Sequence, residues 1–507
     1  MRILFVIAAP LRQGPDGPTS DLASARYRAL IPAQQLARLG HQVEIASIGP
    51  QGWPAAVKES RCETLVISKS FHDANEELAQ TMRSRGVKVV VDFCDDHFLH
   101  PQFGPHFHRL ARLADTIISS TDAMARSVHR HTGRDAVVIT DPVEGPRRMP
   151  KFSPQLPALK LVWFGHPTNL GGLAARAGEL RALACHLAVR LTVVTTLSPE
   201  ASALVEMLSG KDLGRVRAEI VPWSLDATWK ALEDADAGWI PAIDTEQNAV
   251  KSPNRLLETL WAGRLVVADA IPSYLPFADL MPIGKGLERS MVEALDSREQ
   301  VEASLRSAQR RIARDNSPYF CGRQWAAALG DNTAGPLRLN LGCGDKILPG
   351  YVNVDVVEVR AGKKPDVICD LHDLAPFADS SVDEILSVHV VEHFWRWEIR
   401  DVLREWIRVL KPGGRMVVEC PNIKSACETF LQDPEQFSRD DQHGQRTMWV
   451  FYGDPKWKDP LMIHRWGYTP ESLRSLLAEV GLAQIRQEPA QFKLREPRDM
   501  RVVGTKR

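Results

Sequence analysis

Residues 337–355 read L-R-L-N-L-G-C-G-D-K-I-L-P-G-Y-V-N-V-D. The leucines at alternate positions predict a short strand that breaks at two glycines, Gly342 and Gly344. A second short strand, residues 351–354, then carries the acid Asp355 at its end. Glycines let a backbone approach a ligand closely, and an acid after the next strand can accept hydrogen bonds from ribose hydroxyls. The stretch therefore predicts a nucleoside pocket at the carboxyl ends of parallel strands.

The spacing within this stretch distinguishes two kinds of nucleoside cofactor. A dinucleotide fingerprint needs a third glycine, a helix whose amino end holds the pyrophosphate, and an acid about 20 residues further on. Here Asp355 follows Gly344 by only eleven residues, and Pro349-Gly350 interrupts the interval. A pyrophosphate would lack its main anchor, whereas S-adenosylmethionine has a ribose and an adenine but no phosphate. The short loop favours S-adenosylmethionine, and an NAD-dependent oxidoreductase is the disfavoured alternative.

Further motifs follow in order. Residues 366–371, D-V-I-C-D-L, predict a third strand that ends in an acid, and P-F-A-D-S-S-V-D-E-I at 376–385 feeds a fourth. H-V-V-E-H at 389–393 comes after that strand, and L-K-P-G-G at 410–414 predicts a helix end and a tight turn. Together with L-N-L-G-C-G at 339–344, these motifs resemble the class I S-adenosylmethionine-dependent methyltransferases, particularly small ones found with sugar and polysaccharide biosynthesis.

The resemblance implies a Rossmann-like methyltransferase domain over residues 336–507. The acid after the second strand would bind the ribose hydroxyls, and the end of the third strand would border the adenine; a solvated acid and a turn-capping aspartate are the plain alternatives. This sequence has Asn340 where many members have an acid, and Lys346 where they have a third glycine. The cofactor-binding residues that the resemblance implies are Gly342, Gly344, Asp355, Asp370 and Leu371.

Methyl transfer is a displacement at a carbon already activated by a sulfonium, so the protein mainly positions the reactants and deprotonates a hydroxyl acceptor. The candidate general bases are His389, at the end of the fourth strand, and His464. A histidine that only satisfies a backbone group is the alternative for each. Residues 442–466 are aromatic and polar, which fits an acceptor lid. Four aromatic side chains there would stack on sugar rings or pack a small local core: Trp449, Tyr452, Trp457 and Trp466.

The H-V-V-E-H motif also matches H-x-x-E-H, the inverted zinc-protease signature. That chemistry needs a helix running through both histidines and a further ligand. Residues 384–388 instead predict a strand leading into His389. We therefore predict no metal at this motif, and no convincing metal cluster stands out elsewhere in the sequence.

The composition is ordinary for a globular protein, and 507 residues are too many for one compact core. Lysine plus arginine and aspartate plus glutamate number 63 each, so net charge predicts no nucleic-acid binding. The eight cysteines are scattered with no C-x-x-C pair, which favours reduced thiols and a cytoplasmic location. No stretch approaches about 18 uninterrupted apolar residues, so we expect no membrane span, while peripheral membrane contact stays open.

Upstream of residue 336, strand-like and helical stretches alternate in two series. Six strands are expected between residues 3 and 140, and five between residues 160 and 268. A proline-rich segment, residues 142–157, separates the two series and predicts a semi-rigid linker. The pattern predicts an α/β protein in which two doubly wound, mostly parallel lobes, residues 1–145 and 146–330, precede the domain at 336–507.

Residues 251–263 read K-S-P-N-R-L-L-E-T-L-W-A-G and are followed by L-V-V-A at 265–268. They resemble the donor-site segment of family 4-like glycosyltransferases of the B-type (GT-B) fold, which implies a nucleotide-sugar donor. Its glutamate would accept a hydrogen bond from the donor ribose, and its two cations would hold a diphosphate; a glutamate that merely starts a helix is the alternative. The residues implied to bind the nucleotide sugar are Gly165, Lys251, Asn254, Arg255 and Glu258.

Val250 departs from this pattern, because many relatives carry a glutamate there that often contacts the transferred sugar. Polar residues expected on the acceptor side of the cleft are Ser24, Arg26, Arg28, Asp92, Asp95, Asp96 and His97. The two resemblances together predict a bifunctional glycan-modifying enzyme that joins glycosyl transfer from a nucleotide sugar to methylation of a saccharide or lipid-linked glycan, with O-methylation favoured. The alternative is a methyltransferase with a non-catalytic carbohydrate-binding GT-like region, which the missing acid favours.

Overall fold

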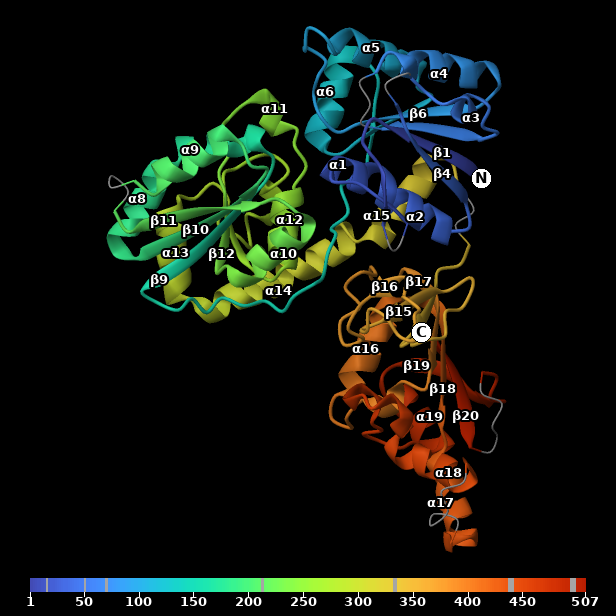
Figure 1. Cartoon of the computed structure of the whole chain (residues 1–507). Helices are drawn as coiled ribbons and strands as arrows, with labels where there is room; N and C mark the ends of the chain where they lie inside the picture. Colours follow the sequence, from blue (N-terminus) through green and yellow to red (C-terminus); the bar gives the residue numbers. More distant parts are fainter. Residues whose placement is uncertain are drawn as a thin grey trace. The chain divides into compact units, whose positions relative to one another are not determined.

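The computed structural model describes residues 1–14, 17–49, 52–68, 72–210, 214–331, 335–435, 442–492 and 498–507, except for the side chains of residues 442–444 and 457. The chain divides into two compact units, Met1–Asn332 and Thr333–Arg507. The first unit has two parallel sheets, which we call the first and second lobes, and the second unit has one mixed sheet (Figure 1). The domain boundaries predicted from the sequence stay predictions.

The first lobe is a parallel sheet in the order β4-β1-β5-β6-β7-β8. Its strands are β1 (Arg2–Ile7), β4 (Gln42–Ser47), β5 (Thr64–Ser68), β6 (Lys88–Phe93), β7 (Thr116–Ser119) and β8 (Val137–Val138). Alternate residues of β1 enter two separate cores, Leu4 and Val6 in one and Ile3, Phe5 and Ile7 in the other. Both faces of the sheet are therefore buried, which explains why the strand is a continuous apolar run.

The helices of this lobe are α1 (Ala23–Ala25), η1 (Arg26–Leu30), α2 (Ile31–Arg38), α3 (Ala55–Lys58), α4 (Ala74–Ser84), α5 (Gly104–Leu113) and α6 (Asp122–Thr132), and a small hairpin pairs β2 (Arg12–Gly14) with β3 (Gly17–Thr19). The helical stretch from α1 to α2 is not a regular α-helix, because η1 is a π-helical turn inserted into it. Such turns are rare, and this one carries three large polar side chains that are buried: Arg26, Tyr27 and Arg28.

The second lobe is a parallel sheet in the order β11-β10-β9-β12-β13. Its strands are β9 (Ala158–Phe164), β10 (Ala188–Thr195), β11 (Val216–Pro222), β12 (Ala237–Ile240) and β13 (Leu265–Ala268). Its helices are η2 (Pro167–Asn169), α7 (Leu170–Ala175), α8 (Ala177–His186), α9 (Pro199–Leu208), α10 (Leu225–Asp234), α11 (Glu246–Ala249), α12 (Asn254–Trp261), η4 (Leu275–Phe277), α13 (Leu287–Asp296), α14 (Arg298–Asp315) and α15 (Pro318–Ala328). The eleven strands predicted for the two lobes are all present.

The end of the first unit returns to the first lobe. Helix α15 packs against α2, and the ring centroids of Trp325 and Phe5 lie 5.6 Å apart (Figure 1). Ser317 caps the start of α15, accepting from the backbone N–H of Phe320 at 3.2 Å. Because chain segments from both ends of the unit build the first core, the two lobes are tied together by more than the proline-rich linker.

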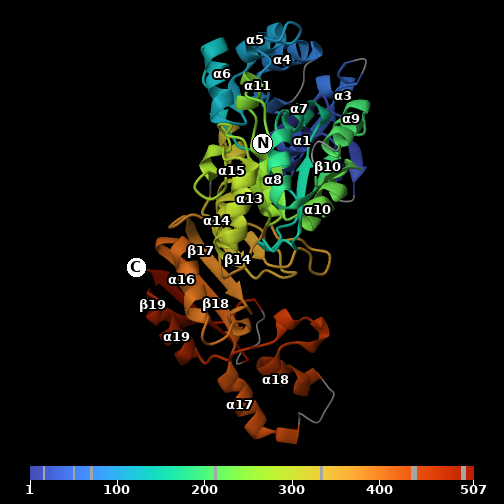
Figure 2. The ribbon, with the colours of Figure 1, turned by 90° about the vertical axis from the view of Figure 1, so that its left-hand side faces the viewer.

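The second unit has a seven-stranded sheet in the order β16-β15-β14-β17-β18-β20-β19. The strands are β14 (Arg338–Leu341), β15 (Val352–Asp355), β16 (Val367–Ile368), β17 (Val382–Val388), β18 (Leu410–Pro421), β19 (Leu482–Glu488) and β20 (Asp499–Lys506), of which β20 runs antiparallel to both of its neighbours. The helices are η5 (Val391–His393), α16 (Ile399–Val409), α17 (Ile423–Gln432), α18 (Gln442–Tyr452), η7 (Pro455–Trp457), η8 (Pro460–Met462) and α19 (Pro470–Glu479). Figure 2 shows α17 and α18 together, beyond the end of the sheet.

Two features of this sheet position the site. The chain order along the sheet reverses between β14 and β17, and ligands of open α/β sheets bind at such a switch point, beyond the carboxyl ends of the strands. Strands β14 and β15 are parallel neighbours, yet the described stretch between them, residues 342–351, contains no helix. Among the described residues of the whole chain, none of the helices has the length and apolar composition that crossing a bilayer requires.

Candidate active sites

A cavity of about 390 Å³ lies at the switch point of the second unit. All five residues predicted to bind the methyl-donor cofactor line it, and so does the candidate base His389. They come from the ends of four strands: the loop after β14, the end of β15, the segment after β16 and the end of β17. The fold therefore brings together six of the seven residues that the sequence predicted for this unit. The seventh, His464, is not among the cavity-lining residues.

The loop after β14 is fixed by the carboxylate of Asp355. Gly342 and Gly344 have φ of 65° and 53°, in the left-handed region that glycine adopts without strain. The Gly344 N–H donates to Asp355 Oδ2 at 2.7 Å, and the Val357 N–H donates to Oδ1 at 2.9 Å. Asp355 is 8% exposed. Each carboxylate oxygen keeps a lone pair beyond these bonds, so the side chain can still accept from a ligand hydroxyl.

Asn340 supports the same loop from below. Its Nδ2 donates to the Lys346 carbonyl at 2.8 Å and to Asn353 Oδ1 at 3.0 Å, and Asn353 Oδ1 also accepts from the Leu348 N–H at 2.8 Å. The amide that stands where relatives carry an acid thus holds the loop in shape. This network replaces the hydrogen bonds that a helix would supply between β14 and β15.

The segment after β16 places the carboxylate of Asp370 against the imidazole of His372. Asp370 Oδ1 accepts from the backbone N–H of His372 at 3.0 Å and lies 2.8 Å from its Nδ1. The hydrogen bond to Asp370 raises the pKa of His372 above its ordinary value. The Leu371 carbonyl accepts from the buried indole of Trp406 at 2.9 Å, which holds the backbone of this strand end in place.

His389 sits in a strained conformation at the cavity wall. Its φ is 56°, which is uncommon for a residue with a side chain, and its N–H donates to the Glu419 carbonyl at 2.7 Å. Its Nδ1 lies 3.5 Å from Glu392 Oε1, and its Nε2 lies 3.4 Å from Asp499 Oδ1. Both carboxylates are buried.

His464 has a different environment. Its Nδ1 lies 2.9 Å from the Val450 carbonyl, and its Nε2 lies 3.8 Å from Glu392 Oε1. Burial lowers the pKa of His464 below its ordinary value. The side chain thus lies beside the buried carboxylate of Glu392 and is not part of the cavity wall.

The predicted lid segment forms a second cavity of about 460 Å³. Trp449 and Tyr452 of α18 line it, together with residues of η7 and η8, and Met462 lines both this cavity and the first. Trp466 is exposed and lines neither, and the side chain of Trp457 lies outside the described part. The two cavities are therefore neighbours that share a wall.

Several cavity residues had no signal in the sequence. They come from loops and from distant segments, and only the fold places them beside the predicted residues. The residues missed are Val356, Val357, Arg360, His372, Phe394 and Phe492.

The residues predicted to hold a nucleotide sugar gather at the start of α12. Lys251 Nζ donates to Asn169 Oδ1 at 2.6 Å, and the guanidinium of Arg255 lies over the ring of Trp163, 5.8 Å from its centroid. A β-carbon at Gly165 would lie 3.6 Å from Arg255 Cδ, so these residues are neighbours. Asn254 begins the helix. Four of the five predicted residues thus surround one corner of the second lobe.

Glu258, the fifth predicted residue, has a different environment. It is the fifth residue of α12 rather than near its start, it is buried, and it accepts a hydrogen bond from the hydroxyl of Tyr27 in the first lobe. Burial and the charge of Glu144 raise the pKa of Glu258 to about 8. Val250, whose position carries an acid in relatives, is 6% exposed and packs into the core of the first lobe.

Three of the seven acceptor-side residues, Arg26, Arg28 and Asp92, form ion pairs. Arg28 contacts Asp92 at 2.6 Å and Asp141 at 3.0 Å, all three buried. Arg26 contacts Glu144 at 2.7 Å. Paired, desolvated charges of this kind hold the lobe together, and removing one partner leaves the other buried and unpaired. Asp96 differs, because it lines a cavity of about 240 Å³ together with residues of α11.

Residues 350–418 match the sequence model of a family described as a methyltransferase domain. None of the curated proteins matches the chain. Among solved structures, HepE of Anabaena in complex with UDP-glucose is 14% identical with a TM-score of 0.49, over 65% of this chain and 100% of its own. A glycosyltransferase from Rickettsia africae ESF-5 is 11% identical with a TM-score of 0.48, over 65% and 98%. OtsA without ligand is 11% identical with a TM-score of 0.47, over 65% and 99%.

The two motif regions quoted from the sequence, residues 251–268 and 339–414, lie in different units. The first unit has two parallel α/β lobes with a terminal helix that returns to the first lobe, and the second has a single sheet in the order 3-2-1-4-5-7-6 when its strands are numbered along the chain. The chain thus joins a unit of two parallel α/β lobes to a unit in which residues 350–418 match the model of a methyltransferase domain.

Proposed function

We propose that the chain is a cytoplasmic, bifunctional glycan-modifying enzyme, which methylates a saccharide hydroxyl with S-adenosylmethionine and transfers a glycosyl unit from a nucleotide sugar. The acceptor is a saccharide or a lipid-linked glycan. One observation carries the methyltransferase half: the residues predicted to bind the cofactor line a single cavity with His389.

The cavity fits an adenosyl sulfonium. Its volume of about 390 Å³ is in the range of small-molecule sites, and Asp355 directs a carboxylate to the end of β15, where a ribose hydroxyl would donate to it. The described stretch 342–351 contains no helix whose amino end could bind a phosphate, which supports a cofactor without a diphosphate. S-adenosylmethionine bound there would supply a methyl group activated by its sulfonium.

His389 is the proposed general base. It lines the cavity, and carboxylates lie near both of its ring nitrogens, so it can take up the proton of an acceptor hydroxyl as the new bond forms. The neighbouring cavity of about 460 Å³ is the proposed acceptor site, because Trp449 and Tyr452 offer aromatic surface for a sugar ring. The shared residue Met462 marks where acceptor and methyl donor would meet.

Calorimetry of the full chain with S-adenosylmethionine tests this half. A charge-assisted hydrogen bond contributes about 1.5–3 kcal/mol, so Asp355→Ala should weaken binding by about 10- to 100-fold. Asp401→Ala, which removes an exposed carboxylate of α16 outside the cavity, is the matched control and should bind normally. No heat with the wild-type chain, or equal affinities for all three proteins, would overturn the assignment.

A second candidate function is favoured by the first unit: a GT-like region that binds carbohydrate without turning over a donor. Glu258 already has a partner in Tyr27, and the position of the missing acid, Val250, is packed into a core. Hydrolysis of UDP-glucose by the full chain, abolished by Glu258→Ala, would support the bifunctional proposal. Glycan binding without turnover, unchanged in Glu258→Ala, would support the second candidate.

A further inference from the structure

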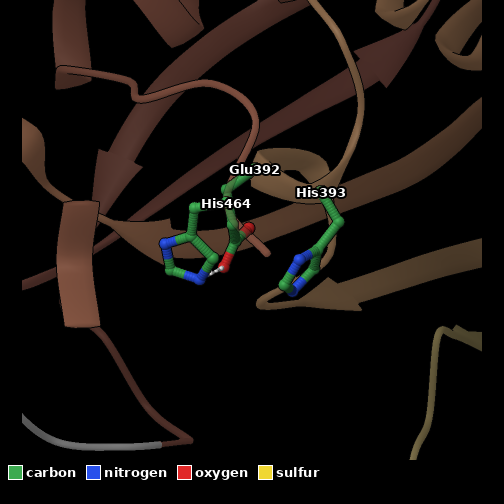
Figure 3. A group of neighbouring side chains, drawn as sticks. All are labelled: Glu392, His393 and His464. Carbon is green, nitrogen blue, oxygen red and sulfur yellow. Dashed lines mark ion pairs between the residues drawn. The ribbon is translucent and has the colours of Figure 1, made fainter. Parts of the chain in front are cut away.

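Three side chains at the edge of the methyltransferase cavity form a cluster of metal-ligand type. Glu392 and His393 belong to η5, and His464 follows η8; one ligand atom of each lies within 4.8 Å of the others. Figure 3 shows the carboxylate of Glu392 between the two imidazole rings. Two turns of the fold that are distant in sequence thus place two nitrogens and a carboxylate oxygen around one point.

The carboxylate of Glu392 lacks the partners that a buried charge needs. Glu392 is 2% exposed, and neither of its oxygens accepts a hydrogen bond. The nearest cationic candidates are imidazoles beyond hydrogen-bond distance, His389 Nδ1 at 3.5 Å and His464 Nε2 at 3.8 Å. An uncompensated buried carboxylate is costly, and a cation held between the same groups would remove that cost.

Both histidines of the cluster are oriented as metal ligands are. His464 Nδ1 lies 2.9 Å from the Val450 carbonyl, and His393 Nδ1 lies 3.1 Å from the Ile463 carbonyl. A carbonyl oxygen only accepts, so each Nδ1 carries the proton of the neutral ring and each Nε2 keeps its lone pair. Backbone carbonyls on the other ring nitrogen are the usual second-shell partners that fix the tautomer of metal-binding histidines.

We propose that Glu392, His393 and His464 bind a divalent transition-metal cation, with Zn²⁺ as the best match to two imidazoles and one carboxylate. Tetrahedral ligands about 2.0–2.1 Å from a metal lie about 3.3 Å from one another. The ligand atoms lie within 4.8 Å of one another, with 3.8 Å between His464 Nε2 and Glu392 Oε1, so metal binding requires them to approach by about 0.5–1.5 Å.

This site differs from the zinc-protease pattern rejected from the sequence. The first histidine of H-V-V-E-H, His389, faces the cofactor cavity and Asp499, while the second histidine and the glutamate turn toward His464. The prediction of no metal rested on the strand that leads into the motif and on the lack of a further ligand recognisable in the sequence. The third ligand comes from the lid segment, far along the chain, so no spacing rule could reveal it.

A second acidic and histidine cluster in the chain lacks these properties. Asp73, Glu76 and His106 also lie within reach of one another, but the side chain of Asp73 is 89% exposed. Glu76 already accepts from Arg109 Nε at 2.6 Å and lies 2.9 Å from His106 Nδ1. A carboxylate that is already paired has no need of a cation, so we assign no site there.

The place of the cluster suggests what the cation would do. His393 lines the methyltransferase cavity, and three protein ligands leave a coordination position open. If the methyl acceptor is a hydroxyl, which rests on the function proposed above, an acceptor oxygen that fills this position would lose its proton more readily. Because Glu392 also lies next to His389, the cation and the proposed base would act on the same acceptor.

Metal titration of the full chain tests the proposal without cofactor or acceptor. After treatment with a chelator, the wild-type chain should bind one equivalent of Zn²⁺ in calorimetry, and Co²⁺ in its place should give visible absorption. Glu392→Gln and His464→Gln should weaken Zn²⁺ binding by at least about 100-fold, whereas His106→Gln should not. Zn²⁺ should raise the melting temperature of the wild type and of His106→Gln but not of Glu392→Gln.

Two results would overturn the site. One is wild-type protein that takes up no Zn²⁺ or Co²⁺; the other is Glu392→Gln that binds as tightly as the wild type. Glu392→Gln keeps the shape of the side chain and removes its buried charge, so it should fold, and its far-ultraviolet dichroism checks this. Loss of metal binding with normal affinity for S-adenosylmethionine separates this proposal from the proposed function.

Discussion

The contact between Gly342 and Val390 offers the most direct test of how the cofactor loop is built. Gly342 has φ +65°, and a β-carbon on it would lie 2.5 Å from Val390 Cγ2 and 3.1 Å from Cγ1. Gly344 has φ +53°, but a β-carbon there would meet nothing nearer than Arg360 Cδ at 3.6 Å. The two glycines share a left-handed backbone and differ in crowding, so Gly344→Ala is a matched control for Gly342→Ala.

The structure gives the magnitudes. An alanine in the left-handed region costs about 1–2 kcal/mol at either position. Gly342→Ala adds about 1–3 kcal/mol of overpacking, because Val390 Cγ2 must retreat from 2.5 Å to an ordinary 3.4 Å, a shift of 0.9 Å. We expect the free energy of opening of this sheet to fall by about 2–5 kcal/mol in Gly342→Ala and by about 1–2 kcal/mol in Gly344→Ala.

Hydrogen exchange of the β14 and β15 amides in the full chain measures that free energy for this unit alone. A double-mutant cycle then isolates the contact. Val390→Ala removes both γ-carbons and leaves the β-carbon 3.4 Å from the new methyl group, which is ordinary contact. Gly342→Ala and Val390→Ala should therefore be coupled by about 1–3 kcal/mol, with the double variant more stable than the sum of the single effects predicts.

A coupling below about 0.5 kcal/mol would refute this reasoning, because it would mean that the backbone of the loop moves aside at little cost. Equal losses in Gly342→Ala and Gly344→Ala would have the same meaning. Val390 also lines the cavity, so calorimetry with S-adenosylmethionine should show weaker binding in Gly342→Ala than in Gly344→Ala if the side chain moves inward.

Three further outcomes follow from other contacts. Burial raises the pKa of Glu258 from 4.5 to about 8, so between these pH values the folded state binds more protons than the unfolded state. The stability of the first unit should therefore fall as pH rises through that window. The melting temperature of Glu258→Gln should lack this dependence on pH. Asp459→Asn removes the charge that pairs with Arg360 at 2.9 Å, at a cost of about 1 kcal/mol. The hydrogen-exchange rate of the η8 amides should therefore rise about fivefold. An unchanged exchange rate would show that this ion pair does not stabilise the lid segment. Val250→Glu places an unpaired carboxylate in the core of the first lobe and should lower the free energy of unfolding by about 3 kcal/mol or more. Its melting temperature should therefore be well below that of Val250→Ala. Equal melting temperatures for the two variants would show that water reaches the position.

The sequence could predict what depends on local pattern. The strands of the lobes are apolar runs bounded by helices and turns, and buried parallel strands leave that signal wherever they occur. The residues around Gly342 and Asp355 were predictable for a related reason. Strand ends in a parallel sheet meet at one edge, so residues at those ends converge even when nothing else about the fold is known.

The sequence could not predict side-chain partners drawn from distant elements. Glu258 was expected to face a ligand, but the π-helical turn of the first lobe directs Tyr27 onto it, and nothing local marks such a turn. The partnership of Glu392 with His464 likewise depends on how the lid segment packs behind η5. His389 and His464 were equal candidates in the sequence, and only the fold separates one at the cavity wall from one that lies beside the buried Glu392.

The absence of a helix between β14 and β15 links the fold of the second unit to its choice of ligand. In the described stretch 342–351, backbone groups of the loop bond to the side chains of Asn340, Asn353 and Asp355 instead of to one another in a helix. A helix would have offered N–H groups to a diphosphate, whereas this loop uses Asp355 both to hold the Gly344 N–H and to face the cavity. Under the proposed function the same carboxylate shapes the site and recognises the ligand. Replacing it by asparagine should then preserve the loop better than it preserves binding, while alanine should impair both.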